Sequence, residues 1–205
     1  SIPLYSVVNP DEIEKRLNAE EGLRLLDYGL TSTKSDFLDY VKGTTYAASV
    51  KNAARGIRFE GTTMFSHRTL KTSYNAALVA SFIRTRLIYE RRSFSFESVF
   101  SHGSKLNELR AAKARGYRIY LYYVAMDASE LCIGRVRERV ASGGHAVPEK
   151  KIRKRYVASL ENLVPALELA YRAYIFDNSG REAVLLAEQT PRRNLNLERE
   201  HMPVW

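Results

Sequence analysis

Apolar and polar positions along the chain predict strands and helices in turn. A short run of β-forming residues over 4–8 ends at Asn9 and Pro10, and Ile13 and Leu17 then follow at helical spacing. The pattern predicts a strand, a polar turn and a helix at this end of the chain.

The alternation is most regular in the second half of the sequence. We expect, in chain order, a long helix over 73–92, a strand over 94–97, a helix over 105–115, a strand over 117–126, a helix over 129–140, a helix over 149–170 kinked or divided at Pro165, strands over 174–176 and 183–186, and a loosely held tail over 192–205. Strands that alternate with helices in this way form a parallel sheet with helices on its faces. The fold class is therefore predicted to be α/β.

The pattern weakens over residues 19–70, where glycines are scattered among short helical pieces. We expect this segment to be an irregular helical insertion. With 45% hydrophobic residues, the 205-residue chain is long enough to bury one core, so a single domain over 1–205 is expected. No apolar run approaches the roughly 18 residues of a membrane-spanning helix, and a cytoplasmic protein without a membrane partner is the expectation.

Charge narrows the choice of partner. The chain carries 32 Lys and Arg against 23 Asp and Glu, a net charge of +9, which favours an anionic ligand such as a nucleotide or a nucleic acid. Basic residues are densest over 135–155, where paired glycines at Gly143 and Gly144 permit a hinge. A mobile lid over 135–160 that places arginines on a triphosphate fits this pattern. A solvated basic face is the alternative for any single arginine.

Two acidic residues directly follow predicted strands, where parallel sheets bind their ligands. Asp11 opens the helix after the first strand, and helix capping is its alternative role. Glu97 ends an aromatic strand, where an unpaired buried carboxylate would be costly; a solvent-facing edge position is the alternative. Ser98 and Lys105 follow Glu97 on the same rim, and they would grip a hydroxylated or phosphorylated ligand.

Other candidate chemistry is weaker. His102 and His145 have no Cys, His or acid at metal-ligand spacing, so no metal site is predicted. The predicted strand over 117–126 holds four tyrosines, Tyr117, Tyr120, Tyr122 and Tyr123. They suggest base stacking, but tyrosines that face both sides of a strand fit core packing better.

Several stretches together resemble the zeta toxins and zeta-toxin-like kinases of bacteria. They are "VVNPDEI" at 7–13, "FSFESVFSHGSKL" at 94–106, "AKARGYRIYLYYVAMD" at 112–127, "RVRERVASGGHAVPEKKIRKRYVASLENL" at 135–163 and "RAYIFDNSG" at 172–180. The resemblance implies a P-loop kinase fold. It also implies transfer of the ATP γ-phosphate, with Mg²⁺, to a hydroxyl of a sugar nucleotide such as UDP-N-acetylglucosamine. Such a protein is the toxin of a toxin–antitoxin pair, so an antitoxin is an implied partner and nucleic acid is not.

The resemblance also assigns roles to residues. Asp11 matches the catalytic base, and Glu97 matches an acid that orients the acceptor sugar. Arg139 and one of Arg153 or Arg155 match the lid arginines that bind the transferring phosphate. Arg155 is taken as catalytic and Arg153 as substrate-binding. Ser98 and Lys105 correspond to further acceptor contacts.

The sequence departs from the family in one respect. Members carry a G-x-x-x-x-G-K-[ST] loop ahead of the "NPDE" motif, and no glycine precedes Asn9 here. Because that loop holds the phosphates, the 205 residues alone are expected to be inactive. A trimmed segment, a natural loss and a loop from a second chain are the open explanations. A degenerate module that binds nucleotide or nucleic acid without catalysis is the alternative function.

Overall fold

The computed structural model describes residues 6–44, 52–67 and 73–199. The chain divides into two compact units, Ser1–Glu97 and Ser98–Trp205. The single domain expected over 1–205 concerns both units together and stays a prediction. Within the described residues, every helix is too short or too polar to cross a membrane.

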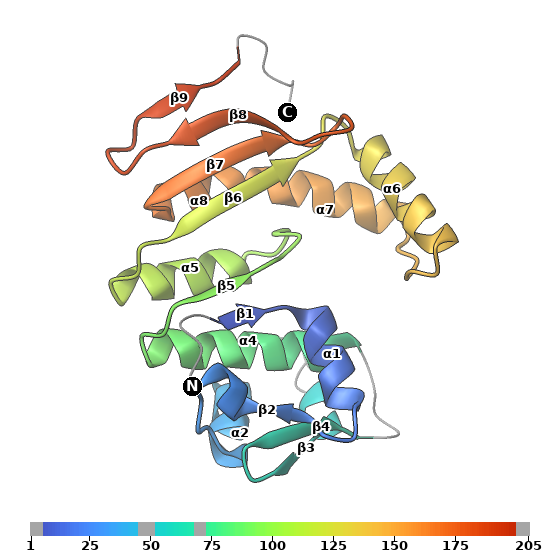
Figure 1. The fold of residues 1–205 in the computed structure, drawn as a ribbon, viewed down its shortest axis with the longest axis vertical. Helices are drawn as coiled ribbons and strands as arrows, with labels where there is room; N and C mark the ends of the chain where they lie inside the picture. Colours follow the sequence, from blue (N-terminus) through green and yellow to red (C-terminus); the bar gives the residue numbers. More distant parts are fainter. Residues whose placement is uncertain (1–5, 45–51, 68–72, 200–205) are drawn as a thin grey trace. The chain divides into compact units, whose positions relative to one another are not determined.

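The first unit combines short strands with three described α-helices (Figure 1). Its elements are β1 (Ser6–Val8), α1 (Pro10–Asn18), β2 (Leu23–Arg24), the 3-10 helix η1 (Leu25–Tyr28), α2 (Lys34–Gly43), the 3-10 helix η2 (Ala54–Gly56), β3 (Ile57–Glu60), β4 (Thr63–Ser66), α4 (Ser73–Tyr89) and β5 (Phe94–Phe96). The predicted strand, turn and helix over the first residues are confirmed by β1 and α1.

Helix α4 is the centre of the first core. The periodicity that predicts this helix places Ala76, Ala77, Ala80, Ile83, Leu87 and Ile88 on one apolar stripe; all are buried except Ala77, which is exposed. Burial extends around the helix to Phe82, whose ring meets that of Phe37 edge-on at 5.2 Å and that of Tyr40 at 5.5 Å. Aromatic pairs in this geometry stabilise a core beyond the area they bury.

Residues 19–70 are more regular than the sequence predicts. Strands β2, β4 and β3 form an antiparallel sheet in that order, and this sheet and its flanks supply Leu23, Leu25 and Met64 to the core. Strands of two to four residues are too short to show the alternation that identifies a strand. Residues 45–51 and 68–70 of this segment lie outside the described residues.

The second unit is a four-stranded sheet with helices. Its elements are α5 (Ser104–Ala114), β6 (Tyr120–Ala125), α6 (Ser129–Ala141), α7 (Glu149–Glu161), α8 (Leu163–Leu169), β7 (Arg172–Asp177), β8 (Val184–Gln189) and β9 (Leu195–Leu197). Strands β6 and β7 are parallel, as predicted, whereas β8 and β9 add antiparallel to the β7 side. The segment over 192–205, expected to be a loosely held tail, contains strand β9, which pairs with β8. Three residues are too few to show the alternation that identifies a strand.

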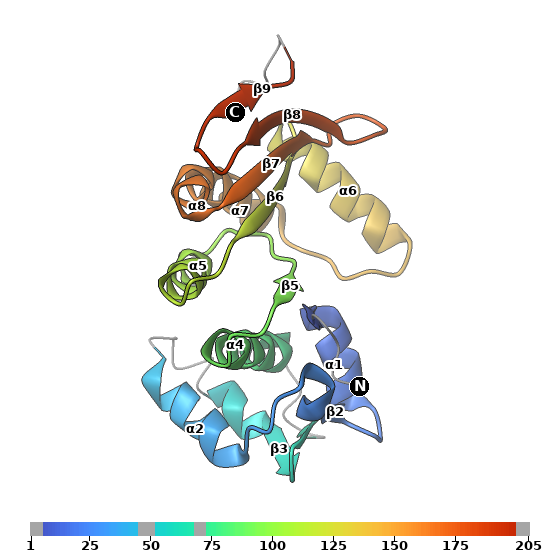
Figure 2. The same cartoon turned by 60° about the vertical axis from the view of Figure 1, so that its left-hand side comes forward.

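One face of this second sheet is packed against helices. Tyr123 and Ile175 are buried there beside Leu163 of α8, and the Tyr123 hydroxyl lies 3.0 Å from Oγ of Ser159 on α7. Figure 2 shows α7 and α8 on the same side of the strands. Core packing of the tyrosine-rich strand is thus confirmed for Tyr123.

The predicted helix over 149–170 is divided, as expected, although the division falls before the proline. Helix α7 ends at Glu161 and α8 begins at Leu163, so that Pro165 occupies the first turn of α8. The first-turn N–H groups of a helix have no intrahelical partner, so a proline is tolerated there. Asn162 at the junction donates from Nδ2 to the Phe100 carbonyl at 2.8 Å.

Candidate active site

Two acidic side chains lie at one edge of the first unit. Strands β1 and β5 are parallel neighbours with Val8 opposite Phe96, so the chain leaves both strands at the same edge. Glu97 follows β5 directly, and Asp11 is the second residue of α1 after β1. We call Asp11 and Glu97 the acid edge. It lies at the carboxyl ends of parallel strands, where ligands bind in α/β sheets.

Asn9 fixes the start of α1 and leaves Asp11 exposed. The Asn9 Oδ1 accepts hydrogen bonds from the N–H groups of Asp11 at 2.8 Å and Glu12 at 3.3 Å, and Pro10 follows as the first helical residue. The capping role considered for Asp11 therefore belongs to Asn9. Within the described residues the Asp11 carboxylate has neither a hydrogen bond nor an ion pair. The carboxylate is exposed, so it is available to a ligand. It also lies at the amino-terminal end of α1, where the helix dipole favours a negative charge.

Glu97 is exposed, so the solvent-facing position given as its alternative is the one observed. The strand that carries Glu97 is held by aromatic and cation contacts. The Phe96 ring stacks on Phe94 at 6.2 Å, and the guanidinium of Arg84 lies 4.9 Å from the centre of the Phe96 ring. Arg84 is 2% exposed on α4. The sequence analysis missed this residue, although an arginine between Ile83 and Leu87 of an apolar stripe was its signal. The packing fixes the strand end from which Glu97 projects.

Ser98 and Lys105 belong to the second unit. Ser98 accepts a hydrogen bond from the Phe100 N–H at 3.1 Å and holds Phe100 at a φ of 57°. The Lys105 ammonium lies 2.9 Å from Glu108, and these side chains are 17% and 12% exposed. Lys105 is thus already paired in a mostly buried position. Their roles as acceptor contacts stay predictions.

Helices α6 and α7 form most of the segment predicted to be a lid. Ion pairs join Arg137 to Glu149 and Arg153 to Glu130, and Arg153 also donates to Oγ of Ser129 at 3.0 Å. The hydrogen bond from Arg153 lowers the pKa of the Glu130 carboxyl. Arg153 is therefore engaged within the segment itself. Movement of the segment stays a prediction.

Arg139 is held by the glycine loop between these helices. Its guanidinium donates to the His145 carbonyl at 3.1 Å, and the Gly144 N–H donates to the Arg139 carbonyl at 2.9 Å. A Cβ on Gly144 would lie 2.7 Å from Cγ and 2.9 Å from the carbonyl oxygen of Arg139. A glycine is therefore required at position 144 for the loop to pack against Arg139. The sequence analysis had interpreted Gly143 and Gly144 as a hinge.

We expect Gly144→Ala to lower the free energy of unfolding by about 1–3 kcal/mol, since the added methyl overpacks against Arg139. Gly134→Ala on α6 is the matched control, because nothing lies within 4 Å of its added Cβ. A helix-interior Gly→Ala change should instead stabilise by about 0.5–1 kcal/mol. Urea denaturation of both variants measures whether the free energy of unfolding falls for Gly144→Ala and rises for Gly134→Ala. Equal changes would show that Gly144 is not sterically constrained.

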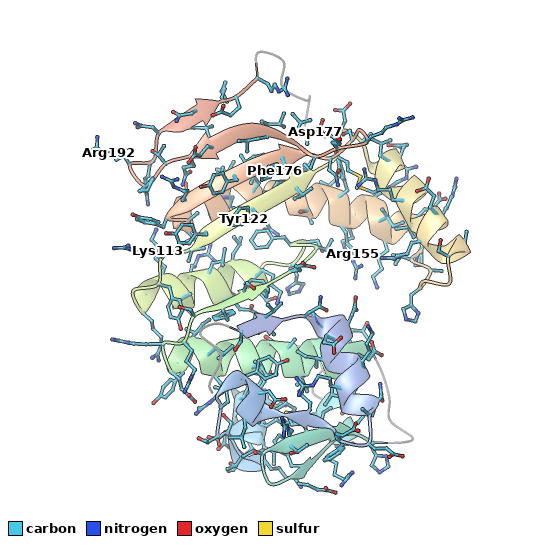
Figure 3. All side chains as sticks on the ribbon, viewed as in Figure 1. Lys113, Tyr122, Arg155, Phe176, Asp177 and Arg192 are labelled. Atoms are coloured by element: carbon cyan, nitrogen blue, oxygen red, sulfur yellow. The ribbon has the colours of Figure 1, made fainter. Side chains whose placement is uncertain are left out.

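Arg155 differs from the other arginines of the segment predicted to be a lid. It is half-buried, and the described parts of the chain offer it neither an ion pair nor a hydrogen bond (Figure 3). It follows the buried Ile152 by three residues and precedes Ser159 by four, and Ser159 contacts β6. Residues at this spacing share a helix face. Arg155 therefore lies on the sheet side of α7 with an uncommitted charge.

The carboxyl ends of β6 and β7 are tied to each other, which the sequence analysis missed. The Ser179 hydroxyl accepts from the Asp127 N–H at 2.7 Å and donates to the Asp177 carboxylate at 2.5 Å. Arg135 of α6 donates to the Asn178 carbonyl at 2.5 Å. The Asp-Asn-Ser sequence directly after a strand was the available signal. These hydrogen bonds join the two strand ends, and the Arg135 guanidinium takes part in them.

The sequence profile of the family described as Zeta toxin matches residues 66–190, more than half of the chain. The chain belongs to the zeta toxin family. An uncharacterized protein of Haemophilus influenzae is 32% identical over 69 residues, which are 34% of this chain and 49% of that protein. The chain thus matches about half the length of this curated relative. No solved structure matches this chain.

The zeta toxin match contains every predicted site residue except Asp11, which precedes it. The α/β architecture, with parallel pairs β1–β5 and β6–β7, is consistent with the P-loop-kinase-like fold expected of a zeta toxin. Within residues 6–44, 52–67 and 73–199, no group of three or more His, Cys, Asp or Glu side chains is arranged to hold a metal ion alone.

Proposed function

We propose that this zeta toxin family chain is the body of a cytoplasmic, ATP-dependent phosphotransferase that acts on a hydroxyl of a sugar nucleotide such as UDP-N-acetylglucosamine. The observation that supports it best is the acid edge. Asp11 and Glu97 follow paired parallel strands, and both carboxylates are exposed and available to a ligand. In this proposal the protein is the toxin of a toxin–antitoxin pair, and its charge of +9 suits an acidic antitoxin.

Asp11 is the general base in this proposal. A sugar hydroxyl becomes a better nucleophile when a carboxylate accepts its proton as the bond to phosphorus forms. The exposed Asp11 carboxylate is free to accept that proton because Asn9, rather than Asp11, caps the helix. Glu97 accepts hydrogen bonds from neighbouring sugar hydroxyls and so orients the acceptor. Ser98 and Lys105 add contacts to the acceptor.

Arginines of the lid neutralise the charge of the transferring phosphoryl group. Arg155 suits this role better than Arg153, because Arg153 is already paired with Glu130. Arg153 contributes to substrate binding. The guanidinium of Arg139 has five N–H donors, so its bond to the His145 carbonyl leaves others for phosphate oxygens.

ATP supplies the transferred phosphoryl group, and Mg²⁺ bound to its phosphates neutralises their charge. Magnesium is commonly held by one or two carboxylates together with substrate phosphates. Asp11 and Glu97 serve the acceptor hydroxyl in this proposal, so the Ser or Thr of the G-x-x-x-x-G-K-[ST] loop would supply the protein ligand of the metal.

The experiment is a direct assay of phosphotransfer. The protein, in a form that carries a G-x-x-x-x-G-K-[ST] loop ahead of these residues, is incubated with ATP, Mg²⁺ and UDP-N-acetylglucosamine, and the product mass is measured. We expect one phosphate to be added to the sugar, and none when EDTA removes the metal. UDP and free N-acetylglucosamine are the matched acceptors. ATP turnover without phosphorylation of any sugar nucleotide would overturn the proposal.

A further inference from the structure

Two tyrosine hydroxyls attach helix α7 to strand β6 of the second sheet. The Tyr156 hydroxyl lies 3.0 Å from the carbonyl oxygens of both Met126 and Asp127, which directly follow β6. A hydroxyl has one proton, so the two carbonyls share it. Nearly one turn further along α7, Oγ of Ser159 lies 3.0 Å from the Tyr123 hydroxyl of β6. The helix is therefore held both at the carboxyl end of the strand and along its length.

Other tyrosines of β6 point away from α7. Tyr120 and Tyr122 alternate with residues of the Tyr123 face, so they lie on the opposite face of the sheet, and they are 53% and 65% exposed. Helices α7 and α8 pack against the Tyr123 face, which is why the core packing expected of Tyr120 and Tyr122 was wrong. The attachment of α7 therefore involves the face of the sheet that carries the core.

Arg155 lies between the points of attachment on α7. Ile152, three residues before Arg155, is 8% exposed. Tyr156 follows Arg155 directly, and Ser159 comes four residues after it. Side chains three and four residues apart lie on one face of a helix. The backbone at Arg155 is therefore held relative to β6 by contacts of residues on both sides of it.

The strand end that Tyr156 contacts is joined to the next strand. The Asp127 N–H donates to the Ser179 hydroxyl at 2.7 Å, and that hydroxyl donates to the carboxylate of Asp177, the last residue of β7. A continuous series of contacts thus runs from α7 through Tyr156 and Asp127 to the loop after β7. All of these residues belong to the second unit, which supplies the whole series by itself.

Arg139 and Arg153 are held in a different way. Arg153 pairs with Glu130 of α6, and the Arg139 guanidinium donates to the His145 carbonyl. Both side chains are thus bonded within the segment predicted to be a lid. Arg155 keeps its guanidinium uncommitted among the described residues, while its helix is attached to the sheet one residue away.

We propose that Tyr156 is a positioning residue for phosphotransfer, which holds Arg155 where it meets the transferring phosphoryl group. This role rests on the one proposed for Arg155. A charged donor stabilises a transition state most when it is already in place, because no reorganisation is then needed as charge develops. A misplacement of about 1 Å can cost about 10²-fold in rate. The Tyr156 hydroxyl itself is bonded to the backbone after β6, so it acts through Arg155.

The test compares Tyr156→Phe with the parent, both in a form that carries the G-x-x-x-x-G-K-[ST] loop. The substitution keeps the ring and removes the hydroxyl. We expect kcat for phosphorylation of UDP-N-acetylglucosamine to fall about tenfold, with the KM for the sugar nucleotide within about twofold of the parent. Amide hydrogen exchange over 152–160 should become faster, because the helix loses a contact with the strand.

A double variant separates positioning from a general effect on the fold. In an Arg155→Ala background, Tyr156→Phe should lower kcat no further, because residues that act as one unit are not additive. Tyr174→Phe is the matched control. It removes a hydroxyl of β7 that accepts a hydrogen bond from Arg172 at 3.2 Å, and it should leave both kcat and exchange over 152–160 unchanged.

The outcomes distinguish this role from the proposed function. If Tyr156→Phe turns over like the parent while Arg155→Ala is slow, the proposed function stands and the positioning role is overturned. The positioning role is also overturned if the two losses multiply in the double variant, since Tyr156 would then act independently of Arg155. A parent that phosphorylates no sugar nucleotide contradicts the proposed function, and the positioning role falls with it. Unchanged exchange in Tyr156→Phe contradicts the attachment of α7 whether or not the parent is active.

Discussion

Replacing Asp11 with Asn lowers the rate of phosphotransfer by about 10²- to 10⁴-fold, the usual contribution of a general base. An amide of the same shape cannot take the hydroxyl proton. Because Asn9 caps α1, the substitution leaves the start of the helix intact, and the free energy of unfolding should change little. Single-turnover rates and ATP binding, measured on a form that carries the phosphate loop, separate chemistry from affinity.

Glu12→Gln is the control for this prediction. Glu12 is the next residue of α1, and its carboxylate forms an exposed pair with Lys15 at 3.8 Å. The control loses the same charge at the same helix end, so a general electrostatic effect would lower both rates alike. Undiminished turnover in Asp11→Asn removes Asp11 from the mechanism.

The second large effect is expected for Arg155→Ala, which should lower kcat by about 10²-fold or more with a smaller change in ATP affinity. An arginine that meets charge as it develops on the phosphoryl group contributes more in the transition state than in the ground state. Arg155 has a side chain on the sheet side of α7 with no bond to lose among the described residues. Its truncation therefore tests chemistry more than folding.

Lys154→Ala is the matched control, since Lys154 is exposed on the adjacent position of α7 and points about 100° away around the helix. For Arg153→Ala we expect a loss of kcat between those of Arg155→Ala and Lys154→Ala, because Arg153 is engaged by Glu130. Equal turnover of all three variants, within a few fold of the parent, means that the basic segment is a solvated surface. The lid roles would then be withdrawn.

The sequence predicted the parts of the fold that rest on long periodic patterns. Helix α4 could be read from its apolar stripe, and β6 and β7 from β-forming runs that alternate with helices. The acid edge followed from the same reading, because Asp11 and Glu97 come directly after two strands. Its placement needed the strands to be neighbours, which the β1–β5 register provides.

Features that depend on packing could not be read in this way. Whether Tyr120 and Tyr122 are core or surface depends on which face the helices cover, and a strand with tyrosines on both faces carries no such information. The burial of Arg84 depends on the Phe96 ring of β5, against which its guanidinium packs. The engagement of Arg153, and the freedom of Arg155, depend on how α6 meets α7, and both residues look alike in a run of basic side chains.

The two ion pairs between α6 and α7 run in opposite senses, since α6 supplies Arg137 and Glu130 while α7 supplies Glu149 and Arg153. Both pairs are solvent-exposed, so dissolved ions screen them. The Debye length falls from roughly 10 Å at 0.1 M salt to about 3 Å at 1 M. The hold of α6 on α7 therefore depends on ionic strength, and rates measured in dilute buffer apply to two helices more closely held than the same helices in concentrated salt.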